Sequence, residues 1–189
     1  ADLDRALPFL INAGIQNAGQ TCSASSRILV ERSAYDAVLE RMVAAYRALK
    51  VGPATGDHDV GPLISATQKK RVGDYLLLAE SRQVVARGRL VDEAPEGGHY
   101  LSPALIAGLE PHHVLANDEI FGPVAAIQTF TDTDDVVRRA NDTEYGLVAY
   151  VFTENMKRGL SICERLEYGM VGLNRGLVSD PAAPFGGVK

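Results

Sequence analysis

The residues best suited to chemistry in this chain surround Cys22, which stands in a run of small and polar residues (Asn-Ala-Gly-Gln-Thr-Cys-Ser-Ala-Ser-Ser-Arg, residues 17–27). The run follows an apolar helical pattern and precedes a short apolar stretch, and it contains no bulky side chain that would bury the thiol. A substrate carbonyl could approach the sulfur, and backbone N–H groups of the small neighbours could donate to its oxygen. Because an isolated cysteine is more often a buried core residue, both interpretations stay open at this point.

Three further blocks make the cysteine run more informative. They lie at residues 117–124 (Asn-Asp-Glu-Ile-Phe-Gly-Pro-Val), 141–147 (Asn-Asp-Thr-Glu-Tyr-Gly-Leu), and 172–174 with 184–189 (Gly-Leu-Asn and Pro-Phe-Gly-Gly-Val-Lys). Together with the cysteine block and Arg27, they resemble the motifs of the aldehyde dehydrogenase superfamily and stand in that family's order. One block would be weak evidence, but four in order are not expected by chance. The resemblance covers essentially the whole chain.

The resemblance implies roles for several residues. Cys22 would attack an aldehyde carbon, the thiohemiacetal would pass a hydride to NAD or NADP, and water would hydrolyse the remaining thioester. Glu119 and Phe121 match positions that hold the nicotinamide ribose and ring, and Gln68 falls near another position that contacts the cofactor. Asn174 matches an asparagine near the cysteine loop. The N–H of Cys22 would be one donor to the oxyanion.

The same residues have simpler interpretations when the resemblance is set aside. Glu119 would be a solvated loop acid and Phe121 a core residue. Gln68 would belong to the polar face of a helix, and Asn174 would cap the end of a strand. Only their positions in the folded chain can separate these interpretations.

Clues to the substrate lie near the C-terminus. Residues 176–179 (Gly-Leu-Val-Ser) followed by Phe185 are similar to succinate-semialdehyde dehydrogenases, in which a serine at the place of Ser179 helps to bind the distal carboxylate. Phe185 belongs to a turn expected at the substrate mouth. Where those enzymes have an arginine just before the cysteine block, this chain has Gln16, and a neutral amide cannot form the bidentate ion pair. We therefore expect a small-molecule aldehyde substrate without assigning succinate semialdehyde.

Hydrophobic periodicity predicts helices and strands that alternate along the chain. Short apolar runs between helices are typical of a largely parallel sheet covered on both faces. We therefore predict an α/β fold with an open, mainly parallel sheet, helices on both faces, and Cys22 in a loop at the sheet edge. Asp2 and Ser33 are predicted N-caps. The predicted helices are 2–15, 34–49, 66–81, 133–141 and 155–166, the predicted strands are 28–30, 84–86, 105–106, 124–130, 147–152 and 170–173, and residues 92–99 are a predicted loop or hairpin.

The domain organisation follows from the blocks that are present and those that are not. We expect residues 1–189 to be one catalytic domain, truncated at both ends, because the family's Glu-Leu-Gly-Gly block with the general-base glutamate does not appear. No Gly-x-Gly-x-x-Gly unit is present, so an N-terminal dinucleotide-binding domain is expected to be missing and the isolated piece to be inactive. The alternatives are a non-catalytic assembly module and a cysteine acyl hydrolase, which would need a histidine beside Cys22.

Composition narrows the partners and the compartment. The 189 residues carry a net charge of −5 without a basic cluster, which argues against nucleic-acid binding, and no apolar run is long enough to cross a membrane. Two widely separated cysteines do not suggest a disulfide framework, so a cytoplasmic location is expected. No metal is expected, because none of the histidines sits at metal-ligand spacing. A homo-oligomer is implied by the resemblance. The histidines are His58, His99, His112 and His113.

Overall fold

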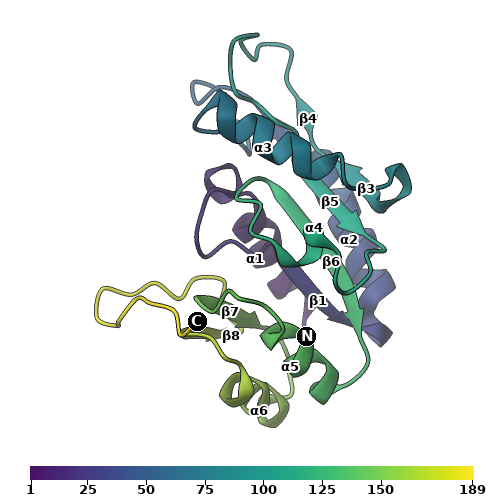
Figure 1. Ribbon diagram of the computed structural model, residues 1–189, viewed down its shortest axis with the longest axis vertical. Helices are drawn as coiled ribbons and strands as arrows, with labels where there is room; N and C mark the ends of the chain where they lie inside the picture. The colour runs from purple at the N-terminus through teal and green to yellow at the C-terminus, as the bar shows by residue number, and fades with distance from the viewer.

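A four-stranded sheet forms the centre of the computed structural model, which describes residues 1–189 (Figure 1). The inner pairings β1–β6 and β5–β6 are parallel, whereas β3 pairs antiparallel with β5 at one edge. Ile28, Ile127 and Ala107 stand in one row across three strands, and all three are buried. The strands lie in the order β1 (Arg27–Glu31), β6 (Val124–Phe130), β5 (Ala104–Ala107) and β3 (Val84–Arg87).

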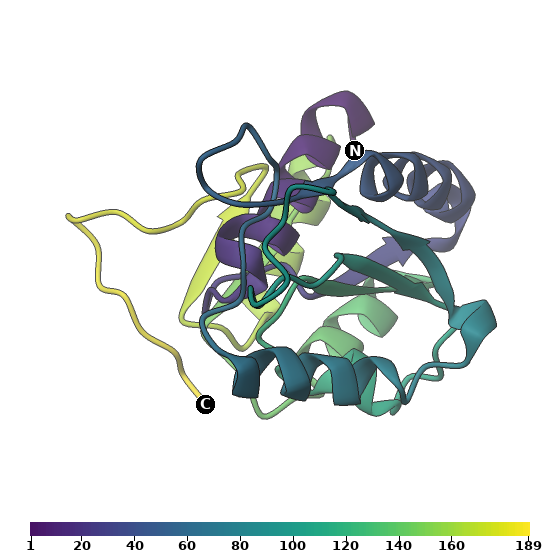
Figure 2. The same ribbon diagram turned by 90° about the horizontal axis from the view of Figure 1, so that it is seen from above.

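Helices cover both faces of this sheet. Figure 2 shows α1 and α2 on one side of it and α3 and α5 on the other. This arrangement explains why β5 and most of β6 are buried without alternation, since both faces of each strand meet a helix. The prediction of an open, mainly parallel α/β sheet with helices on both faces is confirmed. The helices are α1 (Leu3–Ile15), α2 (Tyr35–Ala48), α3 (Ala66–Leu76), α4 (Val114–Asn117), α5 (Thr133–Asn141) and α6 (Met156–Arg165).

The helix starts test the two predicted caps. The side chain of Asp2 accepts a hydrogen bond from the N–H of Asp4 at the start of α1, so this cap is confirmed. Ser33 does not cap α2: it lies inside a short 3₁₀ turn, η2 (Arg32–Ala34), and α2 begins after Ala34 without a side-chain cap. Tightening the chain into that turn satisfies backbone groups that a capping hydroxyl would otherwise bind.

Two small parallel ladders lie outside the main sheet. One joins β2 (Lys50–Val51) to β4 (Arg89–Leu90), and the other joins β7 (Val148–Val151) to β8 (Met170–Leu173). The two-residue strands were not predicted, because two residues carry no periodic signal. The predicted helix 66–81 ends at Leu76, and a 3₁₀ turn, η3 (Ser81–Gln83), follows. Residues 92–99 form turns, as predicted for a loop.

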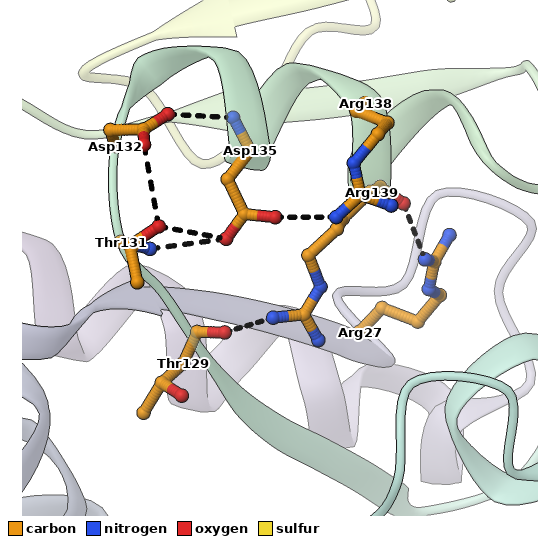
Figure 3. A network of polar contacts seen from close by, with 7 residues as sticks. All are labelled: Arg27, Thr129, Thr131, Asp132, Asp135, Arg138 and Arg139. Atoms are coloured by element: carbon orange, nitrogen blue, oxygen red, sulfur yellow. Dashed lines mark hydrogen bonds and ion pairs between the residues drawn. The ribbon is translucent and has the colours of Figure 1, made fainter.

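A polar network ties the β7–β8 unit, through α5, to the main sheet (Figure 3). The guanidinium of Arg139 on α5 donates to the carbonyl oxygen of Thr129 on β6, and Arg27 on β1 donates to the carbonyl oxygen of Arg139 at 3.0 Å. Asp135 accepts from Arg138 and from Thr131, which fixes the start of α5. These contacts hold the small unit beside the sheet although the two share no strand pairing.

None of the helices combines the length and the apolar character that a membrane crossing requires.

Candidate active site

A tight turn after α1 presents Cys22 to solvent. Helix α1 ends at Ile15, and the 3₁₀ turn η1 (Gln16–Gly19) reverses the chain with left-handed φ values of 51° at Asn17, 55° at Ala18 and 72° at Gly19. The side chains of Asn17 and Gln20 lock the turn, since each amide nitrogen donates to the other residue's carbonyl oxygen at 3.0 Å. The small and polar run identified in the sequence therefore leads out of a rigid turn.

The thiol and N–H of Cys22 are both available to a ligand. Cys22 is exposed, and its N–H makes no hydrogen bond within the chain. An unpaired N–H beside a nucleophile is the kind of donor that can stabilise a developing oxyanion. Cys163 differs: it is half-buried on α6, packs against a small apolar cluster, and burial raises the pKa of its thiol. The structure thus contains one open thiol and one packed thiol.

A second loop, residues 118–121, carries Glu119 and Phe121 and is held by the polar face of α3. The side-chain nitrogen of Gln68 donates to the carbonyl oxygen of Phe121 at 2.7 Å. Arg71 donates to the carbonyl oxygen of Glu119 at 2.8 Å, and Tyr75 donates to the carboxylate of Asp118 at 3.0 Å. The side chain of Gln68 therefore supports the loop by binding the loop's backbone. Gln68 also lies on the polar face of a helix, as its simpler interpretation holds.

Tyr145 completes the support of this loop from the β7 side. Its hydroxyl accepts a hydrogen bond from the N–H of Glu119 at 3.2 Å. The carboxylate of Glu119 makes no hydrogen bond or ion pair in the chain, and both Glu119 and Phe121 are exposed. Phe121 has a left-handed φ of 58°, which turns its ring out of the core. The solvated-acid interpretation of Glu119 fits its exposure, whereas a core position for Phe121 is wrong.

The two loops meet at a glycine contact. A Cβ atom on Gly19 would overlap the carbonyl group of Gly122, and the φ of 72° at Gly19 also disfavours any other residue. A Cβ on Gly122 would in turn strike the side chain of Val72 on α3. The glycines therefore allow the cysteine turn and the Glu119 loop to touch backbone to backbone.

One cavity of about 710 Å³ connects these groups. Its wall includes Cys22, Glu119, Phe121 and Tyr145, so the structure brings together the three residues expected to act on aldehyde and cofactor. The groups come from loops that precede β1, β6 and β7, at the amino ends of the strands, whereas ligands of open α/β sheets commonly bind at the carboxyl ends. No histidine lines the cavity, which disfavours a cysteine hydrolase with a histidine base.

The three predicted residues of the C-terminal segment do not line this cavity. Both side-chain amide atoms of Asn174 bind the backbone of Thr153 at 2.9 Å, so Asn174 joins the ends of β7 and β8, as the strand-cap interpretation holds. Ser179 and Phe185 are exposed and make no hydrogen bond through their side chains. Gly187 and Lys189 of the same segment do reach the cavity wall.

Arg71 and Tyr145 hold the Glu119 loop, and neither was predicted from the sequence to do so. Arg71 lies three residues after Gln68 and four before Tyr75, a spacing that places all three on one side of a helix. That pattern was available in the sequence. The bond from the N–H of Glu119 to Tyr145, 26 residues away in sequence, had no local signal.

Comparisons with known proteins identify the family of the chain. The model of the aldehyde dehydrogenase family matches residues 1–189. A glutarate-semialdehyde dehydrogenase of Pseudomonas putida is 37% identical over 192 residues, which cover 100% of this chain and 39% of the relative. An NADP(+) succinate-semialdehyde dehydrogenase of Escherichia coli is 34% identical over 192 residues, again covering 100% of this chain and 39% of the relative.

Solved structures agree as well. A Mycobacterium tuberculosis aldehyde dehydrogenase complexed with NAD+ has a TM-score of 0.91 at 36% identity and matches 100% of this chain and 39% of its own. A Bacillus cereus aldehyde dehydrogenase in complex with NAD+ has a TM-score of 0.92 at 33% identity, covering 100% of this chain and 38% of its own. The chain spans about two fifths of the length of the relatives it matches. With an exposed cysteine, the ordered motif blocks and a family match over its whole length, the chain belongs to the aldehyde dehydrogenase family.

Proposed function

We propose that residues 1–189 form the catalytic, cysteine-bearing part of an enzyme that oxidises an aldehyde to a carboxylic acid with NAD or NADP. The observation that carries this proposal is the position of Cys22. Its exposed thiol and unpaired N–H open on the same cavity as the free carboxylate of Glu119 and the ring of Phe121. A nucleophile, an oxyanion donor and two groups suited to a nicotinamide nucleoside thus line the same cavity.

The proposed chemistry assigns covalent steps to Cys22. Its thiolate attacks the aldehyde carbon, and the carbonyl oxygen becomes an oxyanion that the N–H of Cys22 stabilises. The C–O double bond reforms as a hydride leaves the carbon, which leaves an acyl thioester on the sulfur. Water then cleaves the C–S bond, releasing the carboxylic acid and the free thiol. A general base for that water is expected outside this chain.

The cavity fits a nicotinamide cofactor at its reactive end. The carboxylate of Glu119 has no partner in the chain and can accept both hydroxyls of a ribose, while the ring of Phe121 offers a face beside it. When bound, the cofactor supplies the acceptor for the hydride. Relatives are named for NADP(+) or solved with NAD+, so either cofactor is consistent. The adenosine end would be held by a dinucleotide-binding domain outside residues 1–189.

This assignment also implies partners and a location for the protein. The partners would be a small aldehyde, the cofactor domain and further copies of the protein in a homo-oligomer. The location would be the cytoplasm. An assembly module without activity is the competing proposal, and it predicts that mutation of Cys22 has no effect on any function of the protein.

Turnover in the presence and absence of the cofactor domain tests the proposal. The enzyme with both parts is expected to reduce NAD or NADP only when an aldehyde is added, with one carboxylate formed per reduced cofactor. Residues 1–189 alone are expected to show less than about one thousandth of that rate, because the hydride has no held acceptor. Absence of aldehyde-dependent reduction in the two-part enzyme, over a broad aldehyde panel, contradicts the proposed function.

Differential alkylation tests the availability of Cys22 without any cofactor. Iodoacetamide is expected to modify Cys22 at least about tenfold faster than Cys163, because the second thiol is half-buried and its pKa is raised by that burial. Peptide mapping by mass spectrometry over a time course gives both rates in one sample. Equal rates, measured with the fold intact, would show that Cys22 is not the preferred nucleophile.

A substitution at Gln16 tests the expected substrate range. Gln16 is exposed at the start of the cysteine turn, and arginine there can pair with a distal carboxylate. Gln16→Arg is expected to raise kcat/KM for succinate semialdehyde by about tenfold relative to butanal, an uncharged aldehyde with the same number of carbons. Gln16→Met is the matched control, since it has similar volume and no charge. A parallel gain for both substrates would exclude charge recognition at this position.

A further inference from the structure

The backbone around Cys22 forms a β-turn with a free carbonyl oxygen at the next residue. Cys22 and Ser23 are the two central residues of this turn, which the N–H of Ala24 closes by donating to the carbonyl oxygen of Thr21 at 3.0 Å. The closing bond uses neither the N–H of Cys22 nor the carbonyl oxygen of Ser23. We call residues 21–24 the cysteine β-turn.

The two ends of the cysteine β-turn are tied to the chain that precedes it. The hydroxyl of Thr21 donates to the carbonyl oxygen of Gln16 at 3.4 Å, just after α1. Beyond the turn, the N–H of Ser25 donates to the carbonyl oxygen of Ala13 in α1 at 3.2 Å. Neither contact holds the two central residues, which carry the groups proposed to act on the aldehyde.

A side chain from β7 binds the middle of the cysteine β-turn. The hydroxyl of Tyr150 donates to the carbonyl oxygen of Ser23 at 3.3 Å, across 127 residues of sequence. This is the one hydrogen bond that Cys22 or Ser23 makes. Tyr150 is half-buried and lines the same cavity as Cys22. The phenol therefore anchors the turn one residue after the nucleophile.

A glycine in the neighbouring strand leaves space for the ring of Tyr150. Tyr150 pairs with Gly172 in the parallel register of β7 and β8. A Cβ atom on Gly172 would lie 3.1 Å from Cδ1 of Tyr150 and 2.7 Å from Cγ1 of Val178. Both distances are shorter than ordinary van der Waals contacts. The absence of a side chain at Gly172 thus allows the ring to lie where its hydroxyl reaches Ser23.

The phenol of Tyr150 stays protonated while it holds the turn. Burial raises the pKa of Tyr150, and the negative charge of a Cys22 thiolate raises this pKa as well. Because the ordinary pKa of tyrosine is already about 10, the hydroxyl remains a donor at neutral pH. The bond to Ser23 can therefore persist when the thiol of Cys22 ionises.

We propose that Tyr150 is a positioning residue for Cys22, because its bond to Ser23 fixes the turn that directs the thiol and the N–H of Cys22 toward the aldehyde. This inference rests on the proposed function, in which Cys22 is the nucleophile. The sulfur must meet the carbonyl carbon while the N–H meets the developing oxyanion, so both groups need fixed directions. A turn released at Ser23 can change both directions together.

Tyr150→Phe tests the proposal in the enzyme with its cofactor domain. The substitution removes the hydroxyl and keeps the ring beside Gly172. At saturating aldehyde, the first-turnover rate of cofactor reduction is expected to fall by about five- to tenfold, the effect of one modest hydrogen bond. KM for the cofactor and for the aldehyde should stay within about twofold. The amplitude of the first turnover counts active sites, so partial unfolding would lower the amplitude and leave the rate per site unchanged.

Tyr168→Phe is the matched control. The hydroxyl of Tyr168 also donates to a carbonyl oxygen, that of Ala140 at 2.7 Å, and Tyr168 also lines the cavity. Its bond holds the end of α5 instead of the cysteine β-turn. Its removal is expected to change the first-turnover rate by less than about twofold. A rate loss that Tyr168→Phe shares would be a general effect of losing a tyrosine hydroxyl, and it would overturn the proposal.

A third variant asks whether the donor itself matters. Replacing Tyr150 with 4-aminophenylalanine puts an N–H donor in the place of the hydroxyl, and we expect it to restore the rate to within about twofold of the unaltered enzyme. No restoration, or an unchanged rate in Tyr150→Phe, overturns the positioning role while the unaltered enzyme still oxidises aldehyde. If the unaltered enzyme shows no aldehyde-dependent reduction, the proposed function itself fails, and this inference fails with it.

Discussion

Replacing Cys22 with serine is expected to lower kcat for aldehyde oxidation by roughly a thousandfold or more in the enzyme with its cofactor domain. A serine hydroxyl is protonated at neutral pH, and no histidine lines the cavity to activate it. The substitution leaves the exposed position and the unpaired N–H of the residue in place. Steady-state turnover with a saturating aldehyde measures the effect, while cofactor binding, followed by quenching of protein fluorescence, is expected to change little.

Cys163→Ser is the matched control for that experiment. Cys163 packs beside Val137, Val151 and Ile162, and it does not itself line the cavity. Its replacement is expected to leave kcat unchanged and to lower the free energy of unfolding by about 1 kcal/mol. Comparable turnover in Cys22→Ser and Cys163→Ser would exclude a covalent mechanism through Cys22. The chain contains no other thiol.

The elements that sequence reasoning placed best are those with strong local signals. The strands 124–130 and 170–173 and the helix 133–141 were predicted with the bounds that the structure has. Each is an apolar or periodic run between turn residues, so the local sequence indicates where the element begins and ends. The helix 66–81 was predicted too long, because Leu77 and Leu78 continue the apolar pattern but are exposed in the structure. Exposure of apolar residues depends on tertiary packing, which periodicity does not report.

Some features of the candidate site could likewise be predicted from the sequence, and others could not. The exposure of Cys22 and its position near Glu119 and Phe121 were expected, because the motif blocks imply a common site. The hydrogen bonds of Arg71 and Tyr145 to the Glu119 loop were not predicted, because they join segments that are far apart in sequence. The side chain of Asn174 binds the backbone of Thr153, a contact that agrees with its simpler interpretation as a strand-end cap.

The sequence also did not predict that β7 lies in a different sheet from β1. Apolar runs identify strands but not their neighbours, so the prediction of one sheet did not specify which strands pair. In the structure the β7–β8 ladder is separate from the four-stranded sheet that contains β1.

Gly19→Ala is expected to damage both the stability and the activity of the protein. The added Cβ overlaps the carbonyl group of Gly122, and the φ of 72° is strained for alanine. Neither partner can rotate away, because both are backbone, so the cysteine turn or the Glu119 loop must move. We expect the free energy of unfolding to fall by about 2–4 kcal/mol and kcat/KM to fall by at least about a hundredfold, measured by urea denaturation and by turnover.

Gly73→Ala separates this effect from the general consequence of adding a methyl group. Gly73 lies inside α3, the helix that supports the Glu119 loop, and nothing stands within 4 Å of the position of its Cβ. Alanine there is expected to stabilise the protein by up to about 1 kcal/mol through helix propensity, with unchanged turnover. If Gly19→Ala matched Gly73→Ala in stability and in kcat/KM, the two loops would not be coupled through the glycine contact. The side chains of α3 alone would then shape the shared cavity. The position of Glu119 relative to Cys22 would depend on Arg71 and not on Gly19.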